Sequence, residues 1–586
     1  MLKPPSLQKR AFLKIFNYTV NKTAIDKAFN RAIAHHQQGQ IDEAHELYEE
    51  ILRSDHNHHF ALQFLGVIAS QKGNHHYARR LLESSLYLNP SDPNAVANLG
   101  QVYFYLGMYD KAIERCDQSI ALNEENPLCH LTRGKALRYL KRFEEAIEAL
   151  DEVVRIQSSL AEAYAHRGFC WHNLGDFAKA LDNYLQVLKL SPENAEVLSH
   201  CAHALFSLER YVEAFGSIDE ALRLNPNYAE ALYHRGLLLQ HDNRLEEAVA
   251  CYSRALQLNP NYPQALEHLA FVMHKMAKSD QECLALLDRS LLVQPHSVSA
   301  LKARAGLLVR LKMLDEALAD YDQIVALEPS DAVTRANRAE TLLLCKRTVE
   351  AIAGFKTALA LGGNEAELTY ALASLGEDIA PTTAPTNYVV KLFDWYARHF
   401  DDHLQSQLEY RTPSLLCQQI VELKPGANLE VVDLGCGTGL CGPLLKPFSR
   451  RLTGVDLSPN MLEMAAKRSL YDELVCSDLG EFLSLHSNKF ELVVASDVLI
   501  YVGALESVFR AVRTAIRLGC LFSFSFETSE TEDFVLRPSR RYAHSVPYVK
   551  KLASQHRFRI ESMEASVIRK EAGQSMHGFI TTLRAI

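Results

Sequence analysis

The stretch Glu430–Leu440, EVVDLGCGTGL, places three glycines at alternate positions directly after an apolar run that ends in an acid. Glycine lets the backbone turn tightly and lets a ligand approach it closely. A dinucleotide site requires G-x-G-x-x-G, but this run is G-x-G-x-G, and no Lys-Ser/Thr pair follows to make a phosphate-binding P-loop. We therefore interpret the run as the first strand-to-helix turn of an α/β sheet.

The segments around this turn alternate between the two kinds of secondary structure. Two helices, near 389–400 and 413–423, precede the turn. The expected strands are 429–434, 451–457, 472–479, 490–499 and 520–527, with helices at 439–446, 459–467, 480–486 and 504–517 and a closing strand pair from 559–566 and 577–586. This order predicts a parallel sheet with helices on both faces, whose ligand lies at the carboxyl ends of the strands.

An acid stands near the end of each of the first three expected strands. Asp433 precedes the first glycine, Asp456 ends the second strand 21 residues after Gly435, and Asp478 ends the third. A carboxylate in the second position suits a ribose diol, and one in the third suits an adenine edge. The ordered set resembles the class I S-adenosylmethionine-dependent methyltransferases, which implies a Rossmann-like domain that binds S-adenosylmethionine.

The part of the chain before this domain repeats every 34 residues. Small residues form one column, and an alanine follows each of them twelve positions later as far as Ala248. Small side chains let two antiparallel helices approach closely, and proline ends the second helix of a pair. The pattern resembles the tetratricopeptide repeat and implies a solenoid. The ten copies begin near 25, 59, 93, 127, 161, 195, 229, 263, 298 and 332.

The whole chain resembles bacterial predicted methyltransferases that contain tetratricopeptide repeats. The phrases FDWYARHFDDHL (393–404), LEYRTP (408–413) and LRPSRRYAHS (536–545) carry this resemblance. It implies that Tyr396 and Phe400 close over the cofactor, although core packing is an equal alternative for these two and for Met461. Cys436 is expected to be a packing residue rather than a nucleophile. The expected cofactor residues are Tyr396, Arg411, Asp433, Gly435, Cys436, Gly437, Gly439, Asp456, Leu457, Met461, Asp478, Leu479 and Asp497.

Another column of the repeats predicts a binding groove. Histidines recur every 34 residues, and an asparagine stands two repeats earlier in the same register. Because each residue turns a helix by about 100°, this column is expected to lie off the buried stripe and to hold a protein or peptide partner. Variation on a solvated face is the alternative. The column consists of Asn98, His166, His200, His234 and His268.

Candidate acid-base groups follow the fifth strand. Glu527, Tyr542 and His544, with Arg541, are expected on a loop that faces the acceptor, and a structured lid without acid-base work is the alternative. The fourth strand ends in ASDVLIY, which lacks the Asp/Asn-Pro-Pro-Tyr/Phe/Trp pattern of methyltransferases that act on base amino groups.

Composition limits the other possibilities. The twelve cysteines form no C-x-x-C pair, so neither a metal site nor a disulfide framework is predicted, and free thiols suit the cytoplasm. No apolar run suits a membrane helix. The net charge of −9 arises before Pro385, where 39 basic and 48 acidic residues stand, against 23 of each afterwards. This balance argues against nucleic-acid binding.

These observations predict four segments and three possible functions. The segments are an N-terminal cap (1–24), the repeat solenoid (25–365), a linker (366–386) and the α/β methyltransferase domain (387–586). The favoured function is methylation of a protein, peptide or carrier-bound acceptor that the repeats recruit. The alternatives are a small-molecule methyltransferase whose repeats serve localisation, and an interaction scaffold with a non-catalytic cofactor-binding domain.

Overall fold

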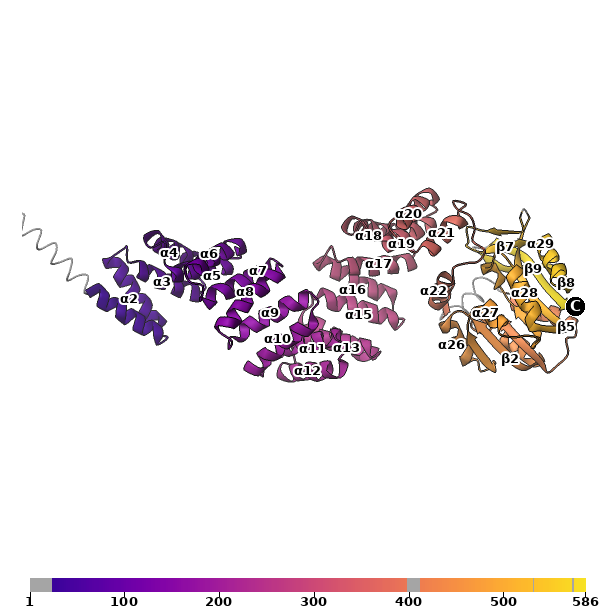
Figure 1. The fold of residues 1–586 in the computed structure, drawn as a ribbon, viewed down its shortest axis with the longest axis horizontal. Coiled ribbons are helices and arrows are strands. Elements are labelled where there is room, and N and C mark those ends of the chain that lie inside the picture. Colours follow the sequence, from indigo (N-terminus) through magenta and orange to yellow (C-terminus); the bar gives the residue numbers. More distant parts are fainter. Residues whose placement is uncertain (1–23, 398–410, 531, 572–573) are drawn as a thin grey trace, which may run out of the picture. The chain divides into compact units, whose positions relative to one another are not determined.

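The computed structural model describes residues 24–397, 411–530, 532–571 and 574–586. The chain divides into two compact units, 1–295 and 296–586. The first unit is helical throughout its described regular structure, and the second joins the remaining repeats to an α/β domain (Figure 1). This confirms the predicted fold class. The expected N-terminal cap lies almost wholly outside the described residues.

The helices of the first unit follow one another as antiparallel pairs at the predicted spacing. Residues 24–37 are helical and precede α2 (Ile41–Ser54). The later pairs are α3 (His59–Gln71) with α4 (His75–Leu88), α5 (Pro93–Tyr105) with α6 (Tyr109–Leu122), α7 (Pro127–Tyr139) with α8 (Phe143–Ile156), α9 (Ala161–Asn173) with α10 (Phe177–Leu190), α11 (Ala195–Ser207) with α12 (Tyr211–Leu224), α13 (Ala229–His241) with α14 (Leu245–Leu258), and α15 (Pro263–Lys275) with α16 (Asp280–Val293).

A contact between a small and a large residue closes many of these pairs. A Cβ atom added at Gly236 would lie 2.5 Å from the ring of Tyr252, and one at Gly168 would lie 2.7 Å from the ring of Tyr184. In each case the large residue stands sixteen positions later, in the second helix of the pair. The pair can therefore approach this closely only where the first helix carries no side chain.

The second unit begins with α17 (Val298–Arg310), α18 (Leu314–Leu327), α19 (Ala332–Leu344) and α20 (Thr348–Ala360). One more helix, α21 (Glu365–Ser374), follows and packs Leu368, Ala371 and Leu372 against the last pair. The linker predicted at 366–386 is therefore wrong in its first half. An apolar helix face covers the end of the repeats there, and the irregular stretch is only 375–385.

The α/β domain begins with α22 (Thr386–Tyr396) and α24 (Thr412–Glu422). The strands are β1 (Leu429–Leu434), β2 (Ser449–Asp456), β3 (Glu473–Cys476), β4 (Phe490–Ala495), β5 (Ile516–Ser529), β6 (Phe534–Leu536), β7 (Tyr542–Ser545), β8 (Phe558–Glu571) and β9 (Gln574–Ala585). The helices between them are α25 (Gly442–Leu445), η2 (Lys446–Phe448), α26 (Pro459–Lys467), α27 (Leu479–Ser484), η3 (Leu499–Tyr501), α28 (Glu506–Ala515) and α29 (Val546–Gln555).

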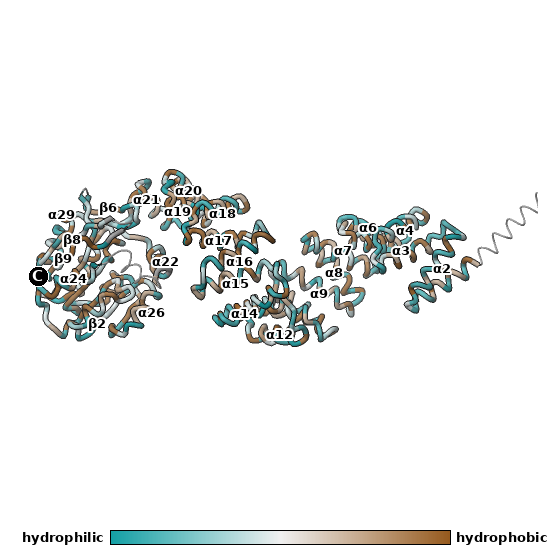
Figure 2. Tube along the Cα trace, turned by 180° about the vertical axis from the view of Figure 1, so that it is seen from behind, coloured by the Kyte–Doolittle hydropathy of each residue, from teal (hydrophilic) through white to brown (hydrophobic). Residues whose placement is uncertain are grey.

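The strands form one sheet in the order β3-β2-β1-β4-β5-β7-β6. Strands β1 to β5 pair in parallel, and β9 pairs with β5 and β8 in antiparallel fashion. All the strands expected from the sequence are present. Figure 2 shows hydrophobic and hydrophilic residues along both the repeats and the α/β domain. The short strands β6 and β7, where a loop was expected, add a hairpin beside the end of β5.

No helix in the described part of the chain is both long and apolar enough to cross a membrane.

The small-to-large contact predicts opposite effects of the same substitution at two helical glycines. Gly236→Ala should lower the free energy of unfolding by about 1–3 kcal/mol, because its methyl group meets the Tyr252 ring. At Gly216, in α12, nothing lies within 4 Å of an added Cβ atom. Gly216→Ala should instead raise the free energy of unfolding by up to about 1 kcal/mol, through helix propensity. Urea unfolding followed by circular dichroism measures both, and equal changes would contradict the packing argument.

Candidate cofactor site

The turn after β1 has the backbone conformation expected of its glycines. Gly435, Gly437 and Gly439 have φ angles of 63°, 53° and 84°, in the left-handed region that side chains disfavour. A Cβ atom at Gly435 would lie 2.2 Å from Cγ2 of Val498, in the turn after β4. The glycine therefore lets the turns after two neighbouring strands pack directly against each other.

Asp456, at the end of β2, joins this turn to the next. Its carboxylate accepts the N–H of Gly437 at 2.8 Å and the N–H of Ser458 at 2.9 Å. Burial raises the pKa of Asp456, and these backbone donors partly offset that rise. Two carboxylate oxygens provide about four acceptor positions, so the two backbone bonds leave capacity for the hydroxyls of a ligand.

Asp433 lies below the glycine turn and is completely buried. One carboxylate oxygen accepts the hydroxyl of Tyr471 at 2.6 Å, and the other, Oδ1, finds no hydrogen-bond partner among the described residues. Burial raises the pKa of Asp433 to about 7. A buried polar atom without a partner is costly, so this oxygen is a site for a donor that the chain itself does not supply.

Asp478 has a second role that the sequence interpretation missed. Its Oδ1 caps α27 by accepting the N–H groups of Gly480 and Glu481, at 2.8 and 3.2 Å. An aspartate followed by a glutamate three residues later is a signal for such a cap. The other carboxylate oxygen of Asp478, Oδ2, takes part in neither of these two bonds. Leu479, another expected cofactor residue, is the first residue of α27.

Three other expected cofactor residues pack near these acids. Met461 is fully buried in α26, and Leu457 is half-buried in an apolar cluster with Phe393 and Tyr501. The Sγ of Cys436 would lie 2.9 Å from a Cβ atom at Gly454, and burial raises the pKa of this thiol well above its ordinary range. Both features of Cys436 suit a packing residue.

Asp497 and Glu527 belong to a buried group of charges. Asp497 has a φ of 54° in the turn after β4 and accepts the hydroxyl of Ser525 at 2.9 Å. The guanidinium of Arg569, from β8, contacts Asp497 at 3.2 Å and also pairs with Glu527. Glu527 pairs in addition with Arg537 at 2.8 Å. Sequence reasoning missed both arginines, because no local motif marks them.

Tyr542 and His544 lie on β7, so the expectation that they stand on a loop after the fifth strand is wrong. The Tyr542 hydroxyl donates to the carbonyl of Pro381 at 2.6 Å. Nε2 of His544 lies 2.9 and 3.0 Å from the carbonyls of Val502 and Gly503, and burial lowers the pKa of His544 to about 4. A neutral imidazole that donates to backbone carbonyls holds β7 in place. Its burial does not suit an acid-base group.

The expected cofactor residues that precede β1 are only partly described. Arg411 is exposed and its N–H reaches the carbonyl of Ile568 at 3.5 Å, where α24 begins. Phe400 and the side chain of Tyr396 lie outside the described residues.

The histidine column in the repeats differs from the expectation. His166 and His200 have side chains 20% exposed, Asn98 and His268 are half-buried, and His234 is buried against Ser199 with Nδ1 and Oγ 2.9 Å apart. The column therefore does not lie wholly off the buried stripe, because His234 meets Ser199 of the preceding helix pair.

A second set of histidines, which shares His234 with the column, has neighbouring rings in successive repeats. The ring centroids of His172 and His203 are 4.7 Å apart, and those of His203 and His234 are 4.8 Å apart. Burial lowers the pKa of all three, in His172 to about 4. They are neutral near pH 7 and pack as aromatic rings, while His200 remains near the carboxylate of Glu230 at 3.7 Å.

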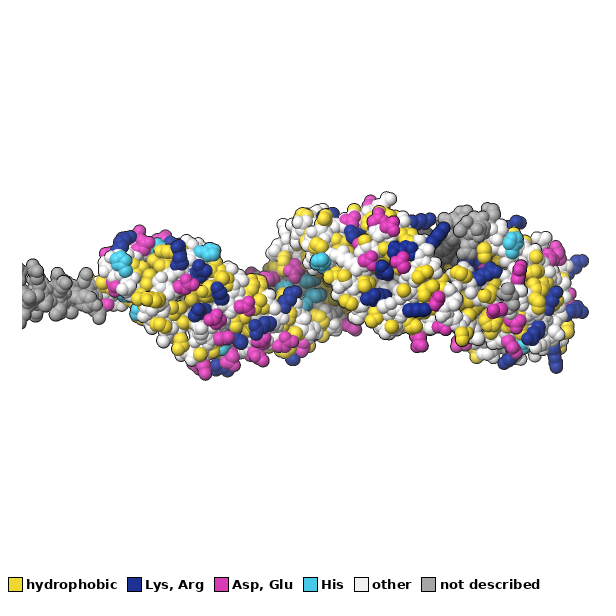
Figure 3. Space-filling view, turned by 90° about the horizontal axis from the view of Figure 1, so that it is seen from above, with side chains coloured by type: hydrophobic (Ala, Val, Ile, Leu, Met, Phe, Trp, Pro, Cys, Tyr) yellow, Lys and Arg dark blue, Asp and Glu magenta, His cyan; other side chains and the backbone are white. Residues whose placement is uncertain are grey.

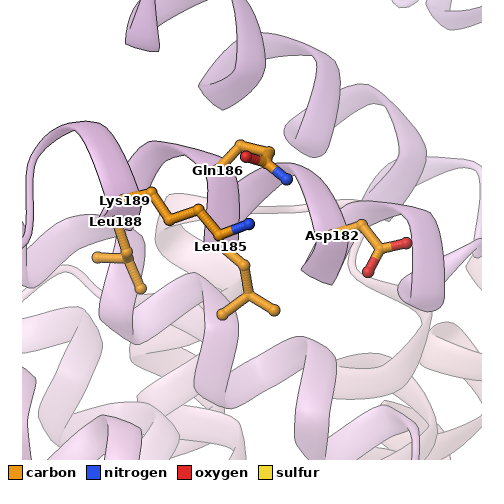
Figure 4. A pocket seen from close by; sticks show the side chains of 5 residues that line it. All are labelled: Asp182, Leu185, Gln186, Leu188 and Lys189. Atoms are coloured by element: carbon orange, nitrogen blue, oxygen red, sulfur yellow. The ribbon is translucent and has the colours of Figure 1, made fainter.

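The described residues form no metal site that would compete with the strand-end group. No group of three or more His, Cys, Asp or Glu side chains there is arranged to hold a metal ion. A shallow hollow is lined by Asp182, Leu185, Gln186, Leu188 and Lys189 (Figure 4). All five lie on α10, and they include no set of groups typical of catalysis.

The residues at the strand ends fit the nucleoside cofactor implied by the resemblance. The glycine turn is a cradle that a side chain would fill, Asp456 and Asp478 retain acceptor capacity, and Asp433 carries an unpaired buried oxygen. These three carboxyl groups therefore offer hydrogen-bond acceptors to a ligand with several donors, and their negative charge suits a positively charged ligand.

The Gly435 contact predicts a paired substitution experiment. Gly435→Ala should weaken binding of S-adenosylmethionine at least about tenfold, because its methyl group displaces Val498 and reshapes the turn. Val498→Ala in the same chain should restore part of the affinity, because it removes the two Cγ atoms at 2.2 and 3.2 Å. Titration calorimetry measures both variants, and a double variant no better than Gly435→Ala would refute the steric cause.

Comparison with known families agrees with the two parts of the fold. A methyltransferase domain model matches residues 431–519. Tetratricopeptide repeat models match 28–50, 161–194 and 229–262, and a model of anaphase-promoting complex, cyclosome, subunit 3 matches 71–153.

The curated relatives share a small part of this chain. The 18S rRNA (guanine-N(7))-methyltransferase of Bos taurus is 32% identical over 124 residues, which is 20% of this chain and 40% of that protein. The ubiquinone biosynthesis O-methyltransferase of a Methylobacterium species is 33% identical over 103 residues, 17% of this chain and 41% of that protein. The chain thus spans less than half the length of these relatives.

Among solved structures, pilF of Pseudomonas aeruginosa is 22% identical, with a TM-score of 0.33, and the match covers 36% of this chain and 97% of that one.

Proposed function

We propose that this chain, which joins tetratricopeptide repeats to a methyltransferase domain, transfers the methyl group of S-adenosylmethionine to an acceptor that its repeats recruit. The observation that carries the proposal is the strand-end site, where the glycine turn, Asp433, Asp456 and Asp478 stand on three neighbouring strands. S-adenosylmethionine supplies an already activated methyl group, so the protein must chiefly bind and orient the two reactants.

We assign the residues of the site by their chemistry. Asp456 accepts hydrogen bonds from the ribose hydroxyls, and Oδ2 of Asp478 accepts a hydrogen bond from the adenine edge. Oδ1 of Asp433 faces positive charge or a hydrogen-bond donor of the cofactor. The glycine turn lets the backbone approach the ligand. Glu527 is held between two arginines, so we assign it and Asp497 to the wall of the acceptor side rather than to proton transfer.

The class of acceptor is the finer part of the proposal. A protein or peptide acceptor is favoured because the repeats offer partly exposed polar groups, such as His166, His200 and Glu230, that a partner could contact. Charges of both signs are interspersed on the face in Figure 3. The relatives include an rRNA methyltransferase, so the exclusion of nucleic-acid acceptors made from charge alone is not supported.

The raised pKa of Asp433 predicts a pH-dependent affinity for the cofactor. The cofactor is cationic, and protonation near pH 7 removes the charge of Asp433, so affinity should fall as the pH falls from about 8 to 6. The stability of the free protein depends on pH in the opposite direction. Because the folded-state pKa of Asp433 exceeds the ordinary value of 3.8, the free energy of unfolding falls as the pH rises through about 7. Asp433→Asn keeps the acceptor for Tyr471 and should make the affinity independent of pH in this range. Calorimetric titration at several pH values measures this, and an equal slope in both proteins would count against the assignment.

The proposed function predicts that methyl transfer depends on Asp456 and on the repeats separately. Cell lysate incubated with the full chain and methyl-labelled S-adenosylmethionine should yield a labelled protein band. Asp456→Ala should weaken cofactor binding at least about tenfold, an effect of about 1.4 kcal/mol or more, and should lose the label at limiting cofactor. His200→Ala should reduce the label while leaving cofactor affinity unchanged.

The outcomes separate the alternatives. If the label appears in small molecules and His200→Ala leaves its amount unchanged, the small-molecule methyltransferase is favoured. Label in RNA would identify a nucleic-acid acceptor. Cofactor binding without any label would favour the non-catalytic scaffold, and no binding at all would refute the proposal.

A further inference from the structure

The hairpin of β6 and β7 carries an arginine into the last repeat. Arg540 lies at its tip with a φ of 58°, a conformation that is strained for a residue with a side chain. Its N–H donates to the carbonyl of Arg537 at 2.8 Å, which closes the turn. The side chain leaves this turn and is only 14% exposed, although the tip of a hairpin is usually solvated.

The partners of Arg540 belong to elements that precede the α/β domain. Its guanidinium pairs with Glu340 of α19 at 2.6 Å and lies 5.8 Å from the ring centroid of Phe355 in α20. The hydroxyl of Tyr370, in α21, donates to the carbonyl of Arg540 at 2.7 Å. Side chain and backbone of this one residue are therefore held by three helices of the repeat array.

The same guanidinium contacts α22, the first helix of the α/β domain. It lies 5.7 Å from the ring centroid of Tyr388, which itself packs on Tyr370 with ring centroids 5.3 Å apart. Lys391 of α22 pairs with Glu367 of α21 at 2.6 Å. Arg540 thus fills the junction between α19, α20 and α22, and the contacts between α21 and α22 continue it.

The other end of α22 reaches the acid proposed to hold the ribose. Asp394 accepts the hydroxyl of Ser458 at 2.5 Å, and its carbonyl accepts the side-chain amide of Asn460 at 3.2 Å. Ser458 donates its N–H to Asp456 and accepts the N–H of Met461 at 3.1 Å. The position of α22 therefore bears directly on the turn that orients Asp456.

We propose that Arg540 is a positioning residue that fixes α22, and through Asp394 and Ser458 the carboxylate of Asp456, against the last tetratricopeptide repeat. The last repeat is on this view a structural part of the cofactor site rather than a separate recruitment module. The inference rests on the proposed function only where it concerns S-adenosylmethionine. The junction itself can be measured without the cofactor.

The test compares full-length variants by calorimetric titration with S-adenosylmethionine. Arg540→Ala should weaken binding about fivefold to tenfold, at the lower end of typical coupling between sites. Arg540→Lys should recover little of this, because it keeps the charge but loses the planar fork and the ring contacts. Arg338→Ala is the matched control. Arg338 lies on α19, two residues from Glu340. Its replacement breaks the 2.6 Å pair with Asp322 of α18 and should leave the affinity unchanged.

Amide hydrogen exchange provides the second readout. Arg540→Ala should speed exchange in α22 and at the start of α26, and should leave α28 as in the parent chain. If Arg540→Ala does not fold, Glu340→Gln serves instead, because it removes the charge of the partner and keeps an acceptor. Unchanged exchange in α22, or the same loss of affinity in Arg338→Ala, would overturn the inference. If Arg540→Ala shows the exchange effect but the parent chain binds no S-adenosylmethionine, the proposed function alone is refuted.

Discussion

The carboxylate of Asp456 joins the turns that follow the first two strands, and the rest of the site is arranged around it. Its two backbone bonds, from Gly437 and Ser458, need a left-handed glycine on one side and a helix start on the other. Because β1 and β2 pair in parallel, their carboxyl ends come to one edge of the sheet. A ligand that binds there meets both turns at once, so the geometry of each depends on the other.

The repeats could be predicted in detail because their information is local and repeated. Many helix pairs join a small residue in one helix to a large one in the next, and Gly236 with Tyr252 shows why the spacing is preserved. The histidine column was interpreted less well. Helical geometry gives the direction of His234 on its own helix, but its burial depends on Ser199 of the preceding repeat. The neighbouring histidines His172, His203 and His234 recur every 31 residues rather than every 34, so the repeat period does not reveal them.

In the α/β domain, the elements that have a local signal were expected and those that depend on distant partners were not. The glycine turn begins directly after β1, and the strand-end acids lie within two residues of a strand end. Arg569 pairs with acids 42 and 72 positions earlier, and Arg540 pairs with an acid 200 positions earlier. The short strand β7 has alternating polar residues, and its burial comes from the loop at Val502 and Gly503 and from Pro381. Its polar residues therefore suggested a loop and a reactive site.

The buried charges near the ends of β4 and β5 explain how the C-terminal hairpin contributes to the same site. Arg569 is 3% exposed and Glu527 is fully buried, so neither charge would be tolerated there alone. Arg569 comes from β8, which reaches the sheet only through β9, and its pairing with Asp497 draws this distant strand to the turn after β4. Asp497 precedes Val498, the residue that fills the space above Gly435. The strained backbone of Asp497 is therefore held from one side by Arg569 and Ser525, and the glycine turn rests on the other. Arg569 of β8 is thus connected to the glycine turn through Asp497 and Val498.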